Sequence, residues 1–297
     1  MNHMLPEGLH PQPEGYTREE LLLAMQQCRV LQARAVLCDE RHALHVPLGC
    51  CEGVIERAEG ARGIAGGQTR DLAILSCVGR PVCFHVLGFF PDGRARLSRR
   101  SAQEQALDLL LRQRPGEILP AVVTGLAEFG AFCDIGCGIA ALLPIDCLSV
   151  SRIASPADRV QVGQQLLCAI KNRDVQGRIV LTLRELLGTW SENAACFAAG
   201  ETVVGIVRSV EEYGVFIEIA PNLAGLAEAD STLRPGQAVS VYIKNILPDK
   251  MKIKLVVVNK NLGQPLRFEP HYFVTRGRLK RWTYSTPQSR KQIETVF

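Results

Sequence analysis

The sequence contains one short pattern twice, and this repeat constrains the fold more than any other feature. The segments 116–144 and 200–228 align without a gap at an offset of 84 positions. Each contains an aromatic residue, a glycine, a small residue and a second aromatic residue, at 129–132 and at 213–216. Repetition at a fixed spacing is typical of an array of similar domains.

The same spacing extends the repeat towards the N-terminus. The VGRPVCFHV segment at 78–86 corresponds to VGQQLLCAI at 162–170. In the last repeat the matching segment, PGQAVSVYIKN, follows a shorter middle loop, and deletions of this kind are tolerated in surface loops. We therefore infer three repeats, at 28–100, 116–184 and 200–258.

Each repeat contains about five short β patterns separated by turns with glycine. Five short strands in roughly 70 residues bury their apolar side chains by curling into a small barrel, and closure removes exposed sheet edges. The segments 101–113 and 184–197 are expected to be helical and to join the repeats. A capping-box pattern at 17–20 predicts a further short helix. The predicted fold class is therefore mainly β, with tandem five-stranded barrels joined by short helices.

Alternation of residue types within the repeats separates two faces of each barrel wall. Phe132 shares a face with Asp134, and Phe216 shares a face with Glu218. An aromatic residue on the same face as a charged residue is expected to be exposed, which predicts an exposed aromatic pair on each of these two barrels. The opposing interpretation is that the rings belong to the barrel cores, because Phe is often buried.

These residues make the chain resemble the S1 RNA-binding domain, the OB-fold module of the bacterial ribosomal protein S1 family. The resemblance covers the second and third repeats well and is weak in the first. It implies that the barrels are OB-folds of the S1 type. It also implies an RNA-binding face made of two aromatic residues of the second strand, a histidine ending the third strand, and an aspartate and an arginine around the last turn.

In the second repeat the resemblance places these residues at Phe129, Phe132, Asp174 and Arg178. Pro144 stands at the histidine position, which departs from the family pattern.

In the third repeat the corresponding residues are Tyr213, Phe216 and Lys252. Glu228 stands at the histidine position, where an acid should repel phosphate. The first repeat has Arg41 and Leu44 near the aromatic positions, so it lacks the stacking platform and is expected to be structural or to bind protein.

Basic residues around the aromatic pairs are expected to contact phosphates and to make binding dependent on salt. The candidates are Lys171, Arg173, Arg178 and Arg184 in the second repeat, and Arg208, Lys244, Lys250, Lys252 and Lys254 in the third. The competing interpretation is that they form an ordinary solvated face.

The expected organisation has five parts. They are a flexible leader with a short helix (1–27), a degenerate S1-like OB domain (28–112), S1-type OB domains (113–195 and 196–262), and a basic aromatic tail (263–297). The tail allows two interpretations: a further RNA contact, or packing of its rings against a barrel while the charges remain in solvent.

Composition and motifs argue against other classes of protein. The eleven cysteines contain no CxxC pair, so we expect reduced thiols, no metal site and no cofactor. The N-terminal residues have no signal-peptide core, and no apolar run is long enough to span a membrane. No Walker loop, HExxH or GxSxG motif occurs, so we expect no catalytic residues and no enzyme activity.

The sequence therefore predicts a cytoplasmic, non-catalytic protein that binds single-stranded RNA, including mRNA, and acts in translation. The small ribosomal subunit is a further candidate partner. The alternatives are an RNA-binding regulator of transcription or RNA decay, and an RNA-binding accessory part of an enzyme.

Overall fold

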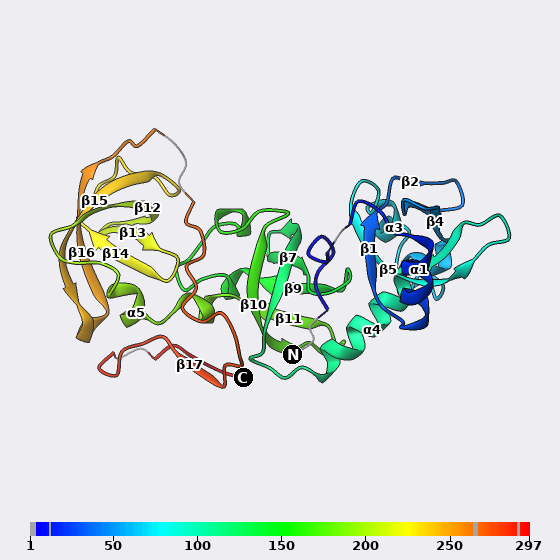
Figure 1. Ribbon diagram of the computed structural model, residues 1–297. Helices are drawn as coiled ribbons and strands as arrows, with labels where there is room; N and C mark the ends of the chain where they lie inside the picture. The colour runs from blue at the N-terminus through cyan, green and yellow to red at the C-terminus, as the bar shows by residue number, and fades with distance from the viewer. Residues whose placement is uncertain (1–3, 12, 264–266, 290–291) are drawn as a thin grey trace. The chain divides into compact units, whose positions relative to one another are not determined.

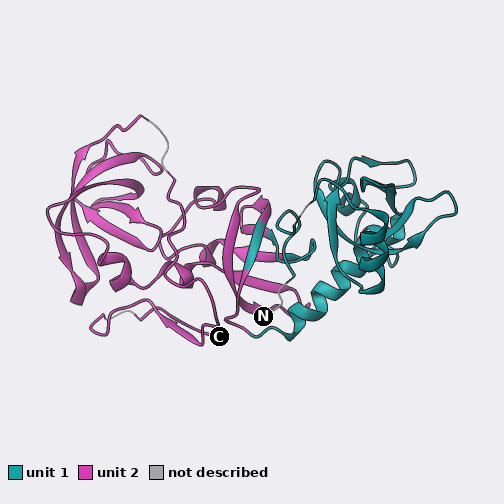
Figure 2. Cartoon of the chain, viewed as in Figure 1, with its two compact units in different colours: residues 1–114, 120–122, 133–140 teal, residues 115–119, 123–132, 141–297 magenta. Residues whose placement is uncertain are grey.

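The computed structural model describes residues 4–11, 13–263, 267–289 and 292–297 (Figure 1). The chain divides into two compact units (Figure 2). Unit 1 contains residues 1–114 together with the short stretches 120–122 and 133–140, and unit 2 contains the remaining residues. No helix in these described ranges is long and apolar enough to cross a membrane.

Unit 1 begins with the capped helix that the sequence predicts. α1 (Arg18–Gln26) has a complete capping box, in which the Thr17 hydroxyl accepts from the Glu20 backbone N–H and the Glu20 carboxylate accepts from the Thr17 backbone N–H. The expected helix at 101–113 is also present, as α4 (Arg99–Arg112), with Ser98 as its N-cap. Both predictions are confirmed, because capping residues fix a helix start locally.

A six-stranded sheet lies between these helices in the sequence. Its spatial order is β1-β5-β6-β4-β3-β2. The strands are β1 (Leu31–Arg34), β2 (Leu37–Cys38), β3 (Leu44–Pro47), β4 (Glu52–Ile55), β5 (Pro81–Phe89) and β6 (Ala95–Ser98), with the short helices α2 (Arg57–Gly60) and α3 (Leu72–Leu75) between β4 and β5. β1 and β2 lie at opposite ends of this order although only two residues separate them along the chain. Taken as one interrupted strand, they give the sheet the same neighbour order as the closed barrels.

Two closed five-stranded barrels follow, which confirms the predicted architecture of the second and third repeats. The first consists of β7 (Ile118–Ala127), β8 (Gly130–Asp134), β9 (Ala140–Pro144), β10 (Gln165–Arg173) and β11 (Ile179–Thr182), with the 3₁₀ turns η1 (Ile145–Cys147) and η2 (Pro156–Asp158) between β9 and β10. The second consists of β12 (Thr202–Glu211), β13 (Gly214–Ala220), β14 (Leu223–Ala227), β15 (Ala238–Leu247) and β16 (Lys252–Asn259), with η4 (Pro248–Lys250) between its last two strands.

The linking segment that was expected to be helical is divided. It forms the 3₁₀ turn η3 (Arg184–Leu187) and the helix α5 (Trp190–Ala194). Gly188 separates them with a φ of +81°, a conformation that glycine adopts without strain. A Cβ at this position would also collide with the Phe273 ring. The tail therefore packs against the break between η3 and α5. The helical pattern in the sequence does not reveal this contact.

The two acids used to predict an exposed face are both buried. Glu218 is fully buried and lies 2.7 Å from the Arg159 guanidinium, which is also fully buried. Arg208 pairs with Glu218 as well, and its side chain is only 10% exposed. The segment around η2 therefore covers the Glu218 side of β13 within unit 2. The expectation that this charge faces solvent was wrong.

Asp134 is buried for a different reason. Its carboxylate accepts hydrogen bonds from the backbone N–H groups of Glu7, Gly136 and Gly138. Glu7 also forms a buried ion pair with Arg99 at 2.7 Å. The described part of the expected flexible leader is thus held by side-chain contacts inside unit 1, because buried polar groups require partners.

The aromatic residues of the tail pack against both barrels of unit 2. The Tyr272 hydroxyl accepts from the Leu167 backbone N–H at 3.0 Å. Trp282 and Tyr284 belong to the buried core cluster of the β12–β16 barrel, and the Tyr284 hydroxyl donates to the Asn222 carbonyl at 2.5 Å. The tail also forms a small ribbon from β17 (Arg281–Thr283) and β18 (Glu294–Val296). Of the two interpretations of the tail, packing accounts for these rings.

The buried indole of Trp282 leads to a stability prediction. Replacing Trp282 with Ala removes a large side chain from a closed core, so we expect the free energy of unfolding to fall by about 3–5 kcal/mol. Urea denaturation of the full-length protein measures this. The matched control is Tyr213→Ala, which removes an exposed ring. Equal effects of the two substitutions would contradict the packing assigned to the tail.

Candidate nucleic-acid interface

The first aromatic pair is exposed on the β7–β11 barrel. Phe129 lies in the turn before β8, and Phe132 lies within β8. Their exposed fractions are 57% and 41%, and their ring centroids are 6.0 Å apart with the rings edge to face. This exposure agrees with the expectation and contradicts the core interpretation. The rings are not stacked on each other, so aromatic surface remains available to a planar ligand.

The second pair repeats this geometry on the β12–β16 barrel. Tyr213 is 70% exposed and Phe216 is half-buried, and their centroids are 6.1 Å apart, again nearly edge to face. The same local sequence therefore produces the same arrangement of rings in two barrels.

The repeated glycine explains why the rings lie where they do. A Cβ on Gly130 would come within 2.5 Å of the Leu143 carbonyl oxygen, and one on Gly214 within 2.6 Å of the Ala227 carbonyl oxygen. Glycine therefore allows β8 to approach β9 closely, and β13 to approach β14 closely. The aromatic residues on each side of the glycine are held by this close pairing of backbones.

Lys171 lies beside the loop that holds the first pair. The Phe129 carbonyl accepts from the Ile145 N–H at 2.9 Å, at the start of η1. The Lys171 ammonium donates to the Cys147 sulfur at 3.1 Å and lies 4.0 Å from the Asp146 carboxylate. η1 thus connects the exposed ring of Phe129 with a cation on β10.

Asp174 and Arg178 order the turn between β10 and β11. The Asp174 carboxylate accepts from the Arg178 Nε at 2.6 Å and from the backbone N–H groups of Gln176 and Arg178. The bond from the Arg178 side chain, followed by the backbone bonds, lowers the pKa of Asp174. The Arg178 side chain remains 71% exposed. Asp174 therefore organises the turn that presents Arg178 to solvent.

The basic residues of the third repeat divide into two groups. Lys244 is exposed on β15, Lys252 and Lys254 are exposed on β16, and Lys250 is exposed in η4. Arg208 differs, because its guanidinium is buried against Glu218. Arg208 is therefore not among the exposed cations of this barrel, and no local pattern in the sequence indicates its buried partner.

The positions that replace the family histidine differ between the barrels. Pro144 ends β9 and is half-buried, whereas Glu228 follows β14 and is exposed. The acid of the third repeat is therefore accessible to a ligand that approaches the end of β14.

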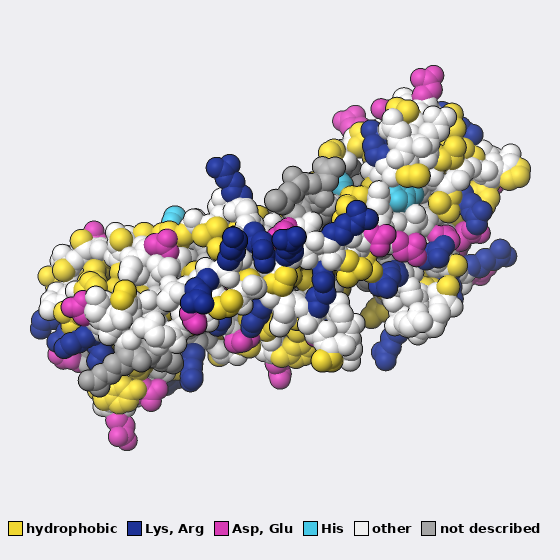
Figure 3. All heavy atoms as spheres, turned by 90° about the horizontal axis from the view of Figure 1, so that it is seen from below, with side chains coloured by type: hydrophobic (Ala, Val, Ile, Leu, Met, Phe, Trp, Pro, Cys, Tyr) yellow, Lys and Arg dark blue, Asp and Glu magenta, His cyan; other side chains and the backbone are white. Residues whose placement is uncertain are grey.

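Figure 3 shows several Lys and Arg side chains gathered on the face that it displays. Such a group is typical of surfaces that bind polyanions.

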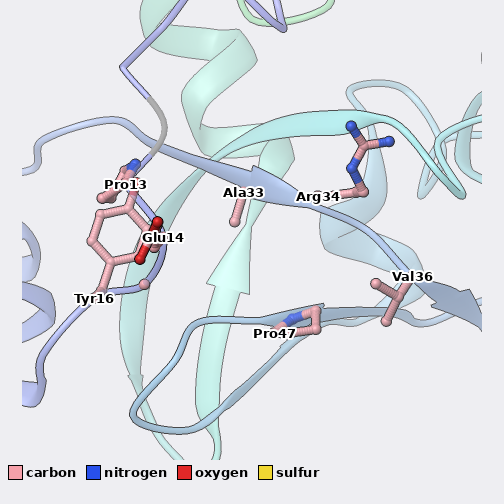
Figure 4. A pocket seen from close by; sticks show the side chains of 8 residues that line it. Pro13, Glu14, Tyr16, Ala33, Arg34, Val36 and Pro47 are labelled. Atoms are coloured by element: carbon pink, nitrogen blue, oxygen red, sulfur yellow. The ribbon is translucent and has the colours of Figure 1, made fainter.

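A separate pocket lies in unit 1, lined by Pro13, Glu14, Gly15, Tyr16, Ala33, Arg34, Val36 and Pro47 (Figure 4). Its lining carries one acidic and one basic side chain, and the Tyr16 hydroxyl donates to the Gln32 carbonyl, so the pocket offers no open stacking surface.

The lowered pKa of Asp174 leads to a prediction about the turn. We expect Asp174→Ala to increase the hydrogen exchange of the Gln176 and Arg178 amides severalfold at neutral pH, because their acceptor is lost. In the wild type this protection is present above the unfolded pKa of about 3.9 and disappears as the pH falls through the lower folded pKa. Asp249→Ala, at an exposed acid of η4, is the control. Unchanged amide exchange in Asp174→Ala would contradict the role of this carboxylate.

The comparisons with known proteins agree with this geometry. Residues 112–184 match the family model of the S1 RNA binding domain. The chain is 30% identical over 182 residues to the small ribosomal subunit protein bS1 of Leuconostoc lactis, covering 55% of this chain and 42% of that protein. Against the bS1 protein of Staphylococcus aureus strain COL the identity is 30% over 185 residues, covering 56% of this chain and 47% of that protein.

The chain thus spans somewhat less than half the length of these curated relatives. A solved multidomain protein with nucleic acid binding domains from Streptococcus pneumoniae aligns over 79% of this chain and 75% of that chain, at 14% identity and a TM-score of 0.26. The match to the family therefore rests on sequence similarity and not on this structural alignment. Residues 112–184 thus match the S1 RNA binding domain, and the chain is similar to bacterial ribosomal protein bS1 over more than half of its length.

Proposed function

We propose that the protein binds single-stranded RNA, including mRNA, on two exposed aromatic platforms and acts in translation in the cytoplasm. The observation that carries this proposal is the exposed pair of Phe129 and Phe132 inside the domain that matches the S1 family. Stacking of a base on an aromatic side chain contributes roughly 1–3 kcal/mol per base and tolerates any sequence.

The platforms favour single strands over duplexes. A base reaches an aromatic ring only when its own faces are free, and in a duplex those faces are stacked on neighbouring base pairs. The rings of Phe129 and Phe132 are exposed on a barrel that also carries Lys171 and, on an ordered turn, the exposed Arg178. Rings for bases and cations for phosphates are the two components of a single-strand binding groove.

Two platforms on one chain strengthen binding. Both pairs belong to unit 2, so an RNA strand bound at one pair is held at a high effective concentration near the other. Such linkage raises affinity by roughly 10²- to 10⁴-fold when both sites are engaged. A long unstructured RNA gains from this more than a short one.

The similarity to bS1 proteins supports a role in translation, with the small ribosomal subunit as a partner. The account requires no catalytic residue, because capture of RNA depends on stacking and charge alone. The protein in this proposal is therefore a non-catalytic RNA-binding component.

The main test removes the first platform. We expect the double substitution of Phe129 and Phe132 with Ala to weaken binding of single-stranded RNA at least tenfold, because stacking of one or two bases is lost. The thermal midpoint should remain close to that of the wild type, since both rings are exposed. Titration of a labelled oligonucleotide measures the affinity of the full-length protein. Unchanged affinity per folded molecule would contradict the proposal.

The matched control removes the second platform, through the double substitution of Tyr213 and Phe216 with Ala. We expect a smaller loss, because the exposed Glu228 repels phosphate near that barrel. Glu228→Gln should then raise the affinity of the protein that lacks the first platform. A larger loss from the second platform would overturn this ranking.

A further inference from the structure

We propose that His10, Cys83 and Cys137 of unit 1 form a binding site for a thiophilic divalent cation such as Zn²⁺. An imidazole nitrogen of His10 and the sulfurs of Cys83 and Cys137 all lie within 4.8 Å of one another. Among the side chains that the structure describes, no other group of histidine, cysteine and acidic residues meets this condition. The proposal is independent of RNA binding and departs from the expectation of no metal site.

The separation of His10 and Cys137 matches that of two ligands in a zinc site. Zn²⁺ binds sulfur at about 2.3 Å and histidine nitrogen at about 2.0 Å, so a tetrahedral site places neighbouring ligand atoms about 3.5–3.8 Å apart. The Cys137 sulfur is 3.8 Å from the His10 Nε2. Two thiolates and an imidazole are soft and borderline ligands, which select Zn²⁺ over Mg²⁺ or Ca²⁺.

The surroundings exclude solvent from the two sulfurs. Cys83 and Cys137 are fully buried, together with Ala102 and Ala106 of α4. The Gln32 side chain is also buried, and its Oε1 lies 3.7 Å from the Cys83 sulfur. From this position it can supply a fourth ligand. Binding of the cation would displace the two thiol protons into solvent.

An unusual backbone conformation and a hydrogen bond fix the position of Cys137 in the proposed site. Cys137 has a φ of +49°, the left-handed conformation that costs energy for a residue with a side chain. Its N–H donates to the Leu5 carbonyl at 3.0 Å. The same carbonyl accepts from the His10 Nε2 at 2.7 Å, so binding of a cation at this nitrogen requires that it release its proton and this hydrogen bond. Such strain in a residue with a metal-binding side chain is typical of functional positions.

Buried hydrogen bonds also fix the other two ligand-bearing segments. The Cys83 N–H donates to the Glu7 carboxylate at 3.0 Å. The Gln32 side chain accepts from the Gly8 N–H at 2.7 Å and donates to the His10 carbonyl at 3.1 Å. Outer contacts of this kind orient the ligands of a metal site. The cation would thus join the segment around His10, strand β5 and the loop around Cys137 within unit 1.

The test measures the metal content of the full-length protein. After purification under reducing conditions, incubation with Zn²⁺ and dialysis, we expect about one equivalent of zinc by mass spectrometry. Cys83→Ala, Cys137→Ala and His10→Ala should each retain less than one tenth of it. Cys133→Ala is the matched control, because it removes another fully buried thiol, four positions before Cys137 in the sequence, and should leave the zinc content unchanged.

Two further readouts keep the result interpretable. Chelation should lower the thermal midpoint of the wild type by several degrees and leave that of His10→Ala unchanged, since ligands that bind the folded state stabilise it. His10 lies in a half-buried leader segment, so its substitution leaves the barrels folded. Zinc content that is absent in the wild type, or equal in the wild type and His10→Ala, would overturn the proposal. A Cys83–Cys137 disulfide in the reduced preparation would also overturn it.

Discussion

The close approach of two backbones at the repeated glycine is the constraint on which the proposed function depends. Gly130 and Gly214 have no Cβ, and this allows each second strand to run close to the carbonyl groups of the third. The flanking residues are then held at the barrel surface, where Phe129 and Phe132 expose their rings. The barrel supplies rigidity, and the rings supply an apolar surface that a base can cover.

Buried ion pairs between distant segments of the chain are a second constraint on the structure. The Glu218 carboxylate is fully buried and pairs with Arg159 and Arg208, so this one position on β13 is shielded from solvent. Removing one member of such a group leaves a buried charge without its partner, which costs about 3–5 kcal/mol. These buried arginines are not available to an RNA ligand, whereas lysines such as Lys244 and Lys252 are exposed and remain candidates for the proposed phosphate contacts.

Local patterns in the sequence predict the local structure well. The capping box at Thr17, the helix α4 and the five strands of each closed barrel all follow from short-range signals. The ring of Phe132 is exposed as predicted, although Asp134, the acid on which that prediction relied, is buried. Contacts between distant segments cannot be predicted from such local patterns. Alternation shows which side chains share a face, but it does not show that Arg159 covers Glu218. The approach of His10 to Cys137, which lie 127 positions apart, has no signal in residue spacing.

The proposal that exposed rings capture unpaired bases is best tested by comparing binding of the intact protein to single-stranded RNA and to a duplex of the same sequence, at several salt concentrations. We expect tighter binding of the single strand. We also expect the logarithm of the affinity for the single strand to fall linearly with the logarithm of the salt concentration, by about 0.7 for each phosphate contacted. Equal or tighter binding of the duplex would contradict the claim that exposed aromatic platforms capture unpaired bases.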